Sequence, residues 1–400
     1  MTTIRNKTVC VVTGSRAEYG LLHWFMHEVQ SASELRLQTL VTGMHLSEKY
    51  GATWKQIEAD GFEISARVDM LEPDNSSLAV ARSTGAGVSG CANALAKLKP
   101  DLIVVLGDRF ESFAAAVAAT FLKIPVAHFH GGETTEGAFD ESLRHCITKM
   151  SHLHFTSTED YRRRVIQLGE DPDRVFNVGA VGLDNADRCQ LLSRDEMEAS
   201  TGIKFLKQNI IVTFHPVTLE HQTASSQFKE LTAALDQLPN VGVIITHPNA
   251  DPGSDAITEE ILQFKQRNQD RVWHFKSLGF IRYLSALQIV DAVVGNSSSG
   301  LIEAPHFRTP TINIGNRQKG RIAGSTVIQC EPEQKSILSA IEEACSSEFK
   351  ASIASANNPY GLPGASKLAA EIIRQSSLDG ILLKHFHDAI PASNSLSDSD

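Results

Sequence analysis

The chain has 400 residues, of which 42% are hydrophobic and 21% are charged, and its formal net charge is −10. This length predicts two or three domains with a sizeable core in each, and the acidic balance argues against general nucleic-acid binding. The sequence contains no apolar run of the about 18 residues that span a membrane, and no signal-peptide pattern. Its six cysteines form no CxxC pair. We therefore expect neither a disulfide scaffold nor a cysteine-based zinc site, but a cytoplasmic protein.

Short apolar, β-branched runs alternate with helical stretches along most of the chain, which is typical of βαβ units around a parallel sheet. Strand runs thin out in the polar stretch 179–202, so we place a domain boundary near residue 180. Two α/β halves that face each other leave a cleft at the carboxyl ends of both sheets, where such sheets bind ligands. The predicted strands are 8–13, 37–42, 101–106, 124–129 and 152–156 in the first half, and 209–214, 241–246, 271–275, 291–295 and 309–314 in the second.

Each candidate site residue of the first half follows a strand, where ordinary helix capping is the competing explanation. In TGSRAEYG (13–20), Ser15 and Glu18 have the spacing of a capping box. Capping does not explain Arg16, because a cation at a helix N-terminus is unfavourable unless an anion also binds there. In LGDRFES (106–112), Asp108 and Glu111 are explained most simply as an N-cap and its partner.

The next loop is harder to explain by capping. AHFHGGETTEGAFDESLRH (127–145) packs three histidines, four carboxylates and one arginine directly after a strand. We expect the like charges of Glu133, Glu136, Asp140 and Glu141 to raise carboxylate pKa values and to make acid/base roles possible. A metal site is a rival interpretation, since His128, His130 and Glu133 have ligand chemistry, but their spacing matches no strong zinc pattern.

In the second half, His215 lies just beyond a strand, at a position that faces the predicted cleft. The segment DAVVGNSSSGLIEAP (291–305) leads from a strand through three serines into a short helix. Backbone amides, serine hydroxyls and the positive helix end together suit a diphosphate, whereas capping accounts for one serine rather than three. Glu303, one turn into that helix, is placed to accept hydrogen bonds from ribose hydroxyls.

Taken together, these segments resemble the hydrolysing UDP-N-acetylglucosamine 2-epimerases, in particular the bacterial sialic-acid-pathway type. The resemblance covers about residues 8–360. It is carried by TGSRAEYG (13–20), TGMHLSEKYG (42–51), VVLGDRFES (104–112), HFHGGETTEGAFDESLRHCITKMSHLHFTSTEDYRRRVIQLGE (128–170), GNSSSGLIE (295–303) and INIGNRQKGR (312–321).

The resemblance implies an α/β fold of GT-B architecture, with two Rossmann-like domains whose parallel sheets face a central cleft. Residues 1–180 are then the N-terminal domain with the acid/base residues, and residues 181–365 the UDP-binding domain. Residues 366–388 are expected to form a helix that crosses back to the first domain, and residues 389–400 a disordered tail.

It also implies a reaction in which the proton leaves C2 of the sugar while UDP leaves C1. This gives 2-acetamidoglucal, and water then adds to release N-acetylmannosamine for sialic acid biosynthesis. Because that C2 hydrogen is only weakly acidic, a positioned carboxylate must act together with departure of the leaving group. The implied substrate is a UDP-sugar, with no nicotinamide or metal cofactor, and the implied assembly is a homodimer or homotetramer.

Residue by residue, the resemblance assigns acid/base roles to Asp108 and Asp140, which overrides the capping explanation for Asp108. Many relatives carry Glu where this chain has His130, so the third such role falls to His130 or Glu133. His215 and Arg16 match positions that stabilise the departing diphosphate. The other implied substrate contacts are His45, Arg109, Glu141, Arg144, Asn249, Phe280, Ser297, Ser298, Ser299, Gly300, Glu303 and Arg321.

Three alternatives remain open at the level of sequence. A related branch performs the same reaction on UDP- or GDP-linked N,N'-diacetylbacillosamine in legionaminic acid biosynthesis. A glycosyltransferase of GT-B architecture and a non-catalytic nucleotide-sugar-binding protein are the others. The last would need the serine loop and Glu303 but neither Asp108 nor Asp140.

Overall fold

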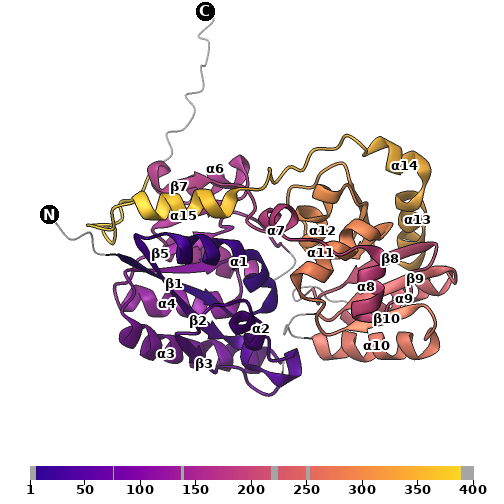
Figure 1. The fold of residues 1–400 in the computed structure, drawn as a ribbon, viewed down its shortest axis with the longest axis horizontal. Coiled ribbons are helices and arrows are strands. Elements are labelled where there is room, and N and C mark those ends of the chain that lie inside the picture. Colours follow the sequence, from indigo (N-terminus) through magenta and orange to yellow (C-terminus); the bar gives the residue numbers. More distant parts are fainter. Residues whose placement is uncertain (1–5, 75, 137–138, 218–223, 249–252, 389–400) are drawn as a thin grey trace, which may run out of the picture.

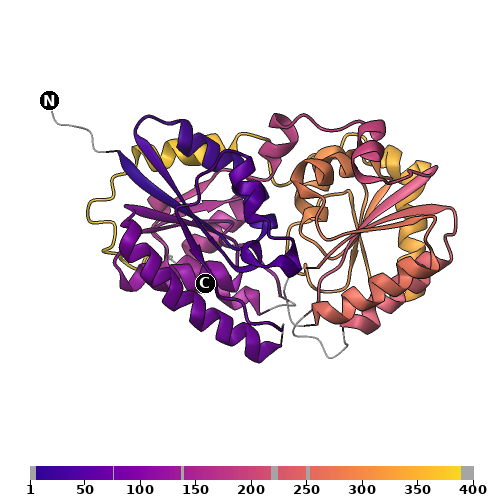
Figure 2. The same ribbon diagram turned by 60° about the horizontal axis from the view of Figure 1, so that its bottom comes forward.

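The computed structural model describes residues 6–74, 76–136, 139–217, 224–248 and 253–388 (Figure 1). One parallel sheet lies in each half of the chain (Figure 2). The first sheet has the order β3 (Ala66–Val68), β2 (Leu35–Thr42), β1 (Lys7–Thr13), β4 (Leu102–Leu106), β5 (Val126–Phe129), β6 (Leu153–Thr156) and β7 (Val175–Asn177). The second has the order β10 (Val272–Phe275), β9 (Val241–Thr246), β8 (Gln208–Thr213), β11 (Ala292–Gly295), β12 (Thr311–Ile314) and β13 (Val327–Cys330). The α/β GT-B fold expected from the sequence is therefore confirmed.

Helices cover both faces of each sheet, as parallel sheets require (Figure 2). Those of the first half are α1 (Arg16–Ser31), α2 (Trp54–Ala59), α3 (Ser77–Leu98), α4 (Phe110–Phe121), α5 (Asp140–Met150), α6 (Glu159–Gln167) and α7 (Leu183–Arg188). Those that follow are α8 (Arg194–Thr201), α9 (Ala224–Asp236), α10 (Ser254–Arg267), α11 (Gly279–Ile289), α12 (Ser299–Ile302), α13 (Gln334–Cys345), α14 (Ser347–Ser352) and α15 (Ala365–Gln375). Short 3-10 turns are η1 (Gly43–Leu46), η2 (Glu48–Tyr50), η3 (Pro172–Arg174) and η4 (Ala304–Phe307). Within the described residues, no helix is both long and apolar enough to cross a bilayer.

The alternation of side chains along a strand explains why the central strands are apolar throughout. In β1, Val9 and Val11 pack into one buried cluster with α1, whereas Cys10 and Val12 pack into another with α3 and α4. Both faces of β1 are therefore core, and the same holds for β8 in the second sheet, between one cluster with Ile210 and another with Ile211.

The ten strands predicted from sequence are present in the structure, within one or two residues at each end. The prediction missed β3, β7 and β13, which have three or four residues each and lie at edges of the sheets. These three strands are only partly buried, so their residues form no continuous apolar run.

The end of the described chain returns to the first half (Figure 1). Ala369 and Ile373 of α15 are fully buried in the same apolar cluster as Leu22 and Phe25 of α1. The predicted helix over residues 366–388 was too long, because α15 ends at Gln375 and its chain direction changes at Ser376, whose backbone is extended. The predicted tail, 389–400, lies outside the described residues.

The site follows from where the strand order reverses in each sheet. β1 pairs with both β2 and β4, and β8 pairs with both β9 and β11. Connections on either side of such a switch point run to opposite faces, which leaves a crevice at the carboxyl ends of the strands. The loops after β1, β4, β8 and β11 therefore meet between the two domains. The predicted boundary near residue 180 lies between β7 and β8.

Candidate functional site

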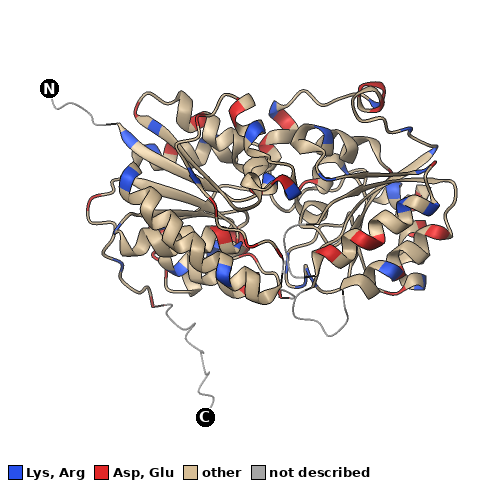
Figure 3. Cartoon of the chain, turned by 90° about the horizontal axis from the view of Figure 1, so that it is seen from below, with Lys and Arg blue, Asp and Glu red and all other residues tan. Residues whose placement is uncertain are grey.

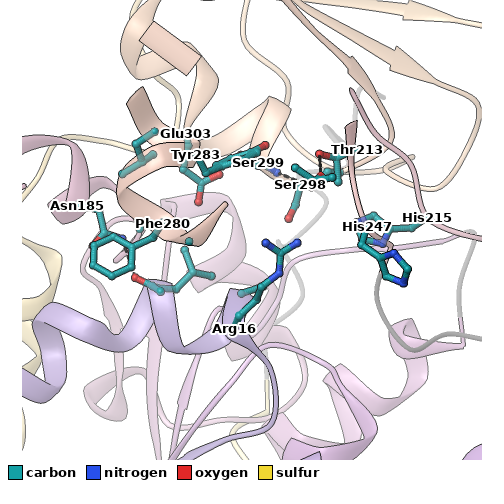
Figure 4. A pocket seen from close by; sticks show the side chains of 18 of the residues that line it. Arg16, Asn185, Thr213, His215, His247, Phe280, Tyr283, Ser298, Ser299 and Glu303 are labelled. Atoms are coloured by element: carbon teal, nitrogen blue, oxygen red, sulfur yellow. Dashed lines mark hydrogen bonds between the residues drawn. The ribbon is translucent and has the colours of Figure 1, made fainter. Parts of the chain in front are cut away.

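Two adjoining cavities lie between the carboxyl ends of the two sheets. One, here called the serine cavity, measures about 210 Å³ and contains the predicted serine loop and Arg16 (Figure 4). The other, here called the carboxylate cavity, measures about 120 Å³ and contains the predicted acid/base residues. The residues that line both are Ala17, Leu21, Ser298, Glu303 and Arg317. A ligand with two chemically different ends can therefore occupy both at once.

The loop after β11 forms one wall of the serine cavity. Gly295 has φ of 140°, and a Cβ there would lie 2.0 Å from the backbone oxygen of Thr213, so only glycine fits. Asn296, which is fully buried, then accepts a hydrogen bond from the amide of His215 at 2.7 Å and donates one to its carbonyl at 2.8 Å. The side chain of Asn296 thus fixes His215 beside the serines.

Arg16 comes to the same cavity from the first domain. Ser15 caps α1 by accepting from the amide of Glu18, as predicted, while Glu18 accepts from Gly14 rather than from Ser15. Arg16 is half-buried and donates to the hydroxyl of Ser277 at 2.9 Å across the domain boundary. Figure 4 shows its guanidinium extending toward Ser298. The capping pattern and a cation aimed at the cavity therefore coexist.

Positive charge is concentrated at this point. Arg317, which lines both cavities, donates to the backbone oxygen of Asn296 at 3.1 Å. Burial, with Arg317, Arg109 and Arg16 nearby, holds the pKa of His215 well below its usual range. The neutral imidazole can donate a hydrogen bond to an anion, and the arginines supply the charge. This combination suits a diphosphate.

Phe280 and Tyr283 of α11 line the serine cavity near Asn185 (Figure 4). The ring of Phe280 lies 5.0 Å from that of His23 and leaves an apolar surface toward the cavity. Glu303 is buried, and burial raises its pKa. Its Oε2 has no hydrogen-bond partner in the described part of the chain. A buried carboxylate oxygen without a partner is costly unless a ligand hydroxyl satisfies it.

In the carboxylate cavity, Asp108 is not the N-cap of α4, since that helix begins at Phe110 with Arg109 as its cap. Asp108 is instead hydrogen-bonded to the guanidinium of Arg144 and, at 3.3 Å, to the hydroxyl of Thr135. Arg144 is 1% exposed and also donates to the carbonyl of His130 at 3.0 Å. Arg144 therefore holds Asp108 and the turn at His130 in place, and it also lines this cavity, as the prediction required.

His130 and Glu133 form a buried pair. His130 Nδ1 lies 2.9 Å from Glu133 Oε1, and Glu133 Oε2 lies 3.1 Å from a guanidinium nitrogen of Arg321. Burial alone would raise the pKa of Glu133, but Arg321, His130 and Arg144 more than offset it and hold the pKa far below its usual range. An ionised Glu133 can only accept, so His130 Nδ1 carries the shared hydrogen.

When His130 is neutral, its other ring nitrogen, Nε2, therefore carries a lone pair. Nε2 is buried and has no partner among the described residues, and His130 lines the carboxylate cavity. The backbone at His130 has φ of 61°, in the left-handed region that a side chain rarely adopts. Such strain costs about 1–3 kcal/mol and concentrates at functional sites. His130 thus presents a proton acceptor to the cavity.

The expected rise of carboxylate pKa values was wrong for Glu133 and Glu141, whose pKa values are lowered. Glu133 is surrounded by cations, and Glu141 accepts from His145 at 3.1 Å and from the amide of Thr135, which lowers its pKa against the opposing effect of burial. Glu136 faces Lys319 of the second domain at 3.8 Å. The loop brings carboxylates near cations rather than near each other.

Several predicted substrate contacts do not reach the cavities. His45 is fully buried, with its two ring nitrogens 3.0 and 2.7 Å from the hydroxyls of Thr13 and Thr53, and it lines neither cavity. Burial lowers its pKa to about 3, so it is a neutral core histidine. Gly300 is a packing residue, since a Cβ there would lie 2.5 Å from Thr311 Cγ2.

Glu141 also lies outside the linings of both cavities. Asn249 falls outside the described residues. His128 is a poor metal ligand here, because both of its ring nitrogens already have partners. They lie 2.7 Å from the carbonyl oxygen of Gly107 and 3.2 Å from the hydroxyl of Thr148. Asp140, Arg109, Arg321, Ser297 and Ser299 do line one of the two cavities, as the prediction required.

Sequence reasoning missed residues whose roles depend on contacts between distant segments. Arg317 and Gln318 both donate to the backbone of Asn296, and Glu18 lines the carboxylate cavity. The run RQKGR after β12 was a signal for a basic cluster, although only Arg321 was singled out. In the view of Figure 3, acidic and basic residues are interspersed over both domains, so the negative net charge forms no single face there.

Comparison with known proteins identifies the family that the chain resembles. A family model described as UDP-N-acetylglucosamine 2-epimerase matches residues 27–374. The GDP/UDP-N,N'-diacetylbacillosamine 2-epimerase (hydrolyzing) of Campylobacter jejuni is 38% identical over 96% of this chain and 99% of its own. The polysialic acid biosynthesis protein P7 of Escherichia coli is also 38% identical, over 96% of this chain and 97% of its own. A UDP-N-acetylglucosamine 2-epimerase of Neisseria meningitidis serogroup B is 32% identical over 85% of this chain and 88% of its own.

Solved structures agree at the level of the fold. The UDP-GlcNAc 2-epimerase of Neisseria meningitidis bound to UDP-GlcNAc superposes with a TM-score of 0.78 at 19% identity, over 92% of this chain and 100% of that one. The Methanocaldococcus jannaschii UDP-GlcNAc 2-epimerase, in complex with UDP-GlcNAc and UDP, gives 0.75 at 16% identity, with the same coverage. The extent of the family match and of the sequence identity shows that the chain belongs to the UDP-N-acetylglucosamine 2-epimerase family.

Proposed function

We propose that this enzyme is a hydrolysing 2-epimerase that converts UDP-N-acetylglucosamine and water into UDP and N-acetylmannosamine. The observation that carries the proposal is that the two cavities adjoin and share five lining residues. The serine cavity offers Arg16, Arg317 and three serines to a diphosphate, and the carboxylate cavity begins directly beside Ser298. A nucleotide diphosphate in the first then places its sugar among the proton-transfer groups of the second.

The first step is elimination of UDP. The C2–H bond breaks, its electron pair forms the C1–C2 double bond of 2-acetamidoglucal, and the C1–O bond breaks with its pair going to UDP. Arg16, Arg317 and His215 stabilise the charge that develops on the diphosphate, an effect worth several kcal/mol where water is excluded. Water then adds to C1 while a proton is delivered to C2 from the opposite face, which gives the inverted product.

We assign the acid/base roles to Asp108, Asp140 and His130. All three line the carboxylate cavity, and His130 Nε2 is free to take a proton. Glu133 is instead the carboxylate that orients His130 and neutralises Arg321, because its own oxygens are occupied by His130, Ser157 and Arg321. We therefore propose His130 rather than Glu133 for the third acid/base role.

The second candidate substrate is UDP- or GDP-linked N,N'-diacetylbacillosamine, which the name of the Campylobacter jejuni relative supports. More than half of the residues around the carboxylate cavity have an ionisable side chain. Such a lining suits the hydroxyl groups at C4 and C6 of N-acetylglucosamine better than an acetamido and a methyl group. The name of the Escherichia coli relative supports a role in sialic acid biosynthesis.

The test is release of the nucleoside diphosphate from each of the three nucleotide sugars, at equal concentration and with matched enzyme. We expect kcat/KM to be highest for UDP-N-acetylglucosamine. A higher value for either diacetylbacillosamine derivative would transfer the assignment to that sugar and leave the reaction unchanged. We further propose that the enzyme acts in the cytoplasm and that it is a homodimer or homotetramer. Light scattering would test the oligomeric state.

A further inference from the structure

Glu18 is an additional carboxyl group in the carboxylate cavity to which the mechanism above gives no role. It lies in the first turn of α1, is 4% exposed, and lines this cavity with Asp108 and Asp140. Its Oε2 accepts from the amide of Gly14 at 2.8 Å. The question is what its other oxygen does.

Glu18 Oε1 lies 3.0 Å from the hydroxyl oxygen of Ser112, which also lies 3.2 Å from the carbonyl oxygen of Leu106. A serine hydroxyl has one hydrogen, so it can donate to only one of these two acceptors. Ser112 is 1% exposed, which leaves no room for water to relieve the other contact. A proton on Oε1 removes the conflict: Glu18 then donates to Ser112, and Ser112 donates to Leu106.

The charges around Glu18 point the same way. Glu111 is fully buried and is held by Arg109, whose Nε and Nη2 lie 3.1 and 3.3 Å from its two oxygens. With the guanidinium facing Glu111, ionisation of Glu18 adds a second buried negative charge beside it. Burial and Glu111 raise the pKa of Glu18 to about 7, against the opposing effects of Arg109 and of the hydrogen bonds with Gly14 and Ser112. The other charged or titratable groups that face the cavity are Asp108, His130, Glu133, Asp140, Arg144, Glu303, Arg317 and Arg321.

We propose that Glu18 is a positioning residue that works as a neutral carboxylic acid, hydrogen-bonded to Ser112, while the sugar is processed. This rests on the proposed function of the site. Ionised Glu18 would add a buried negative charge near the site where negative charge develops on the departing diphosphate, so turnover falls when its proton is lost. Glu18 thereby sets the alkaline limit of the reaction.

A direct test that needs no turnover is ¹³C NMR of enzyme labelled at the glutamate side-chain carboxyls. The resonance absent from Glu18→Gln is that of Glu18. We expect it at the position of a protonated carboxyl in mildly acidic buffer, with a midpoint near neutrality. We expect the midpoint to fall in Glu111→Gln, where Arg109 no longer faces a neighbouring carboxylate. A carboxylate signal throughout the titration would overturn the proposal, even if the enzyme proves to act on another sugar.

The kinetic test is the pH profile of kcat/KM. Glutamine keeps the shape of Glu18 and can donate to Ser112 while it accepts from Gly14, but it cannot ionise. We expect Glu18→Gln to lower kcat/KM by about tenfold or less in mildly acidic buffer and to remove the alkaline decline. A folded variant that keeps the same decline, or that is inactive at every pH, would overturn the proposal. If NMR shows a protonated Glu18 but the wild type turns over none of the three nucleotide sugars, only the proposed function is refuted.

Discussion

His130 Nδ1 lies 2.9 Å from Glu133 Oε1, with both side chains buried, and this contact determines which nitrogen of His130 faces the carboxylate cavity. A carboxylate that orients an imidazole recurs wherever histidine transfers protons, because it fixes the tautomer and stabilises the charged form. Here the same carboxylate also neutralises Arg321, which comes from the other domain. Glu133 therefore links His130 of the first domain to Arg321 of the second.

Replacement of Glu133 by glutamine should damage both activity and stability. We expect turnover to fall by about 10²–10⁴-fold, because His130 loses its orienting partner, and unfolding free energy to fall by about 3–5 kcal/mol, because Arg321 and Arg144 lose a buried counter-charge. His130→Ala should lower turnover similarly while the ion pairs of Glu133 remain. The double variant should lose little more turnover than His130→Ala alone. Fully additive losses would show that the two residues act independently.

Asp108→Asn and Asp140→Asn should each lose more than about a thousandfold in turnover, as expected for removal of a general acid or base and its cooperating partner. The control is Asp160→Asn, an exposed carboxyl on α6 that pairs with Arg163. Steady-state kinetics of the three purified variants, with circular dichroism to check folding, provide the measurement. Near-normal turnover in both cavity variants would refute their assignment.

Asn296→Ala should weaken binding of UDP by about 10- to 30-fold, since two hydrogen bonds of about 1 kcal/mol each hold His215 in place. The matched control is Asn313→Ala on β12, which is equally buried and donates to Gln329 away from both cavities. Calorimetric titration with UDP compares the two. If both variants bind UDP as tightly as the wild type, His215 does not contribute through its fixed position.

Gly295→Ala should cost more than about 3 kcal/mol of unfolding free energy, because the new Cβ meets the backbone of Thr213 and the φ of 140° disfavours any side chain. Gly202→Ala is the control for backbone conformation alone. Its φ is 75°, and a Cβ there meets nothing within 4 Å, so we expect a loss of about 1–2 kcal/mol. Chemical denaturation measures the unfolding free energy of both variants. Equal losses would mean that the backbone of Thr213 in β8 moves aside without cost.

Stability in acid should depend on Glu170, which ties residue 384 of the final segment to the first domain. Glu170 lies 2.9 Å from His154 and 2.6 Å from both Lys149 and Lys384. Burial opposes its ionisation, but these partners lower its pKa from 4.5 to about 2. Between these two pKa values the unfolded chain binds more protons than the folded chain. The contribution of Glu170 to the free energy of unfolding is therefore complete above pH 4.5 and is lost as pH falls toward 2. Unfolding of Glu170→Gln should be less pH-dependent in this window than that of the wild type, and identical slopes would contradict the assignment.

Much of this architecture was predictable because its signals are local. The β-branched runs of β1, β4, β8 and β11 are buried on both faces, so they mark the strands on either side of each switch point. Ser297 to Ser299 were found because one cap cannot account for three hydroxyls. The residues that the sequence analysis missed or misplaced depend on partners far away in the chain. Asn296 acquires its role only when β8 lies beside β11. The same is true of His45, which is satisfied by two threonines that no pattern connects to it.

The central claim is that the enzyme breaks the C2–H bond of a UDP-linked 2-acetamido sugar and releases the free epimer. The most direct measurement is NMR of products formed from UDP-N-acetylglucosamine in deuterated water. The account predicts UDP and free N-acetylmannosamine that carries deuterium at C2. Release of N-acetylglucosamine with hydrogen retained at C2, as in simple hydrolysis or glycosyl transfer to water, would contradict it.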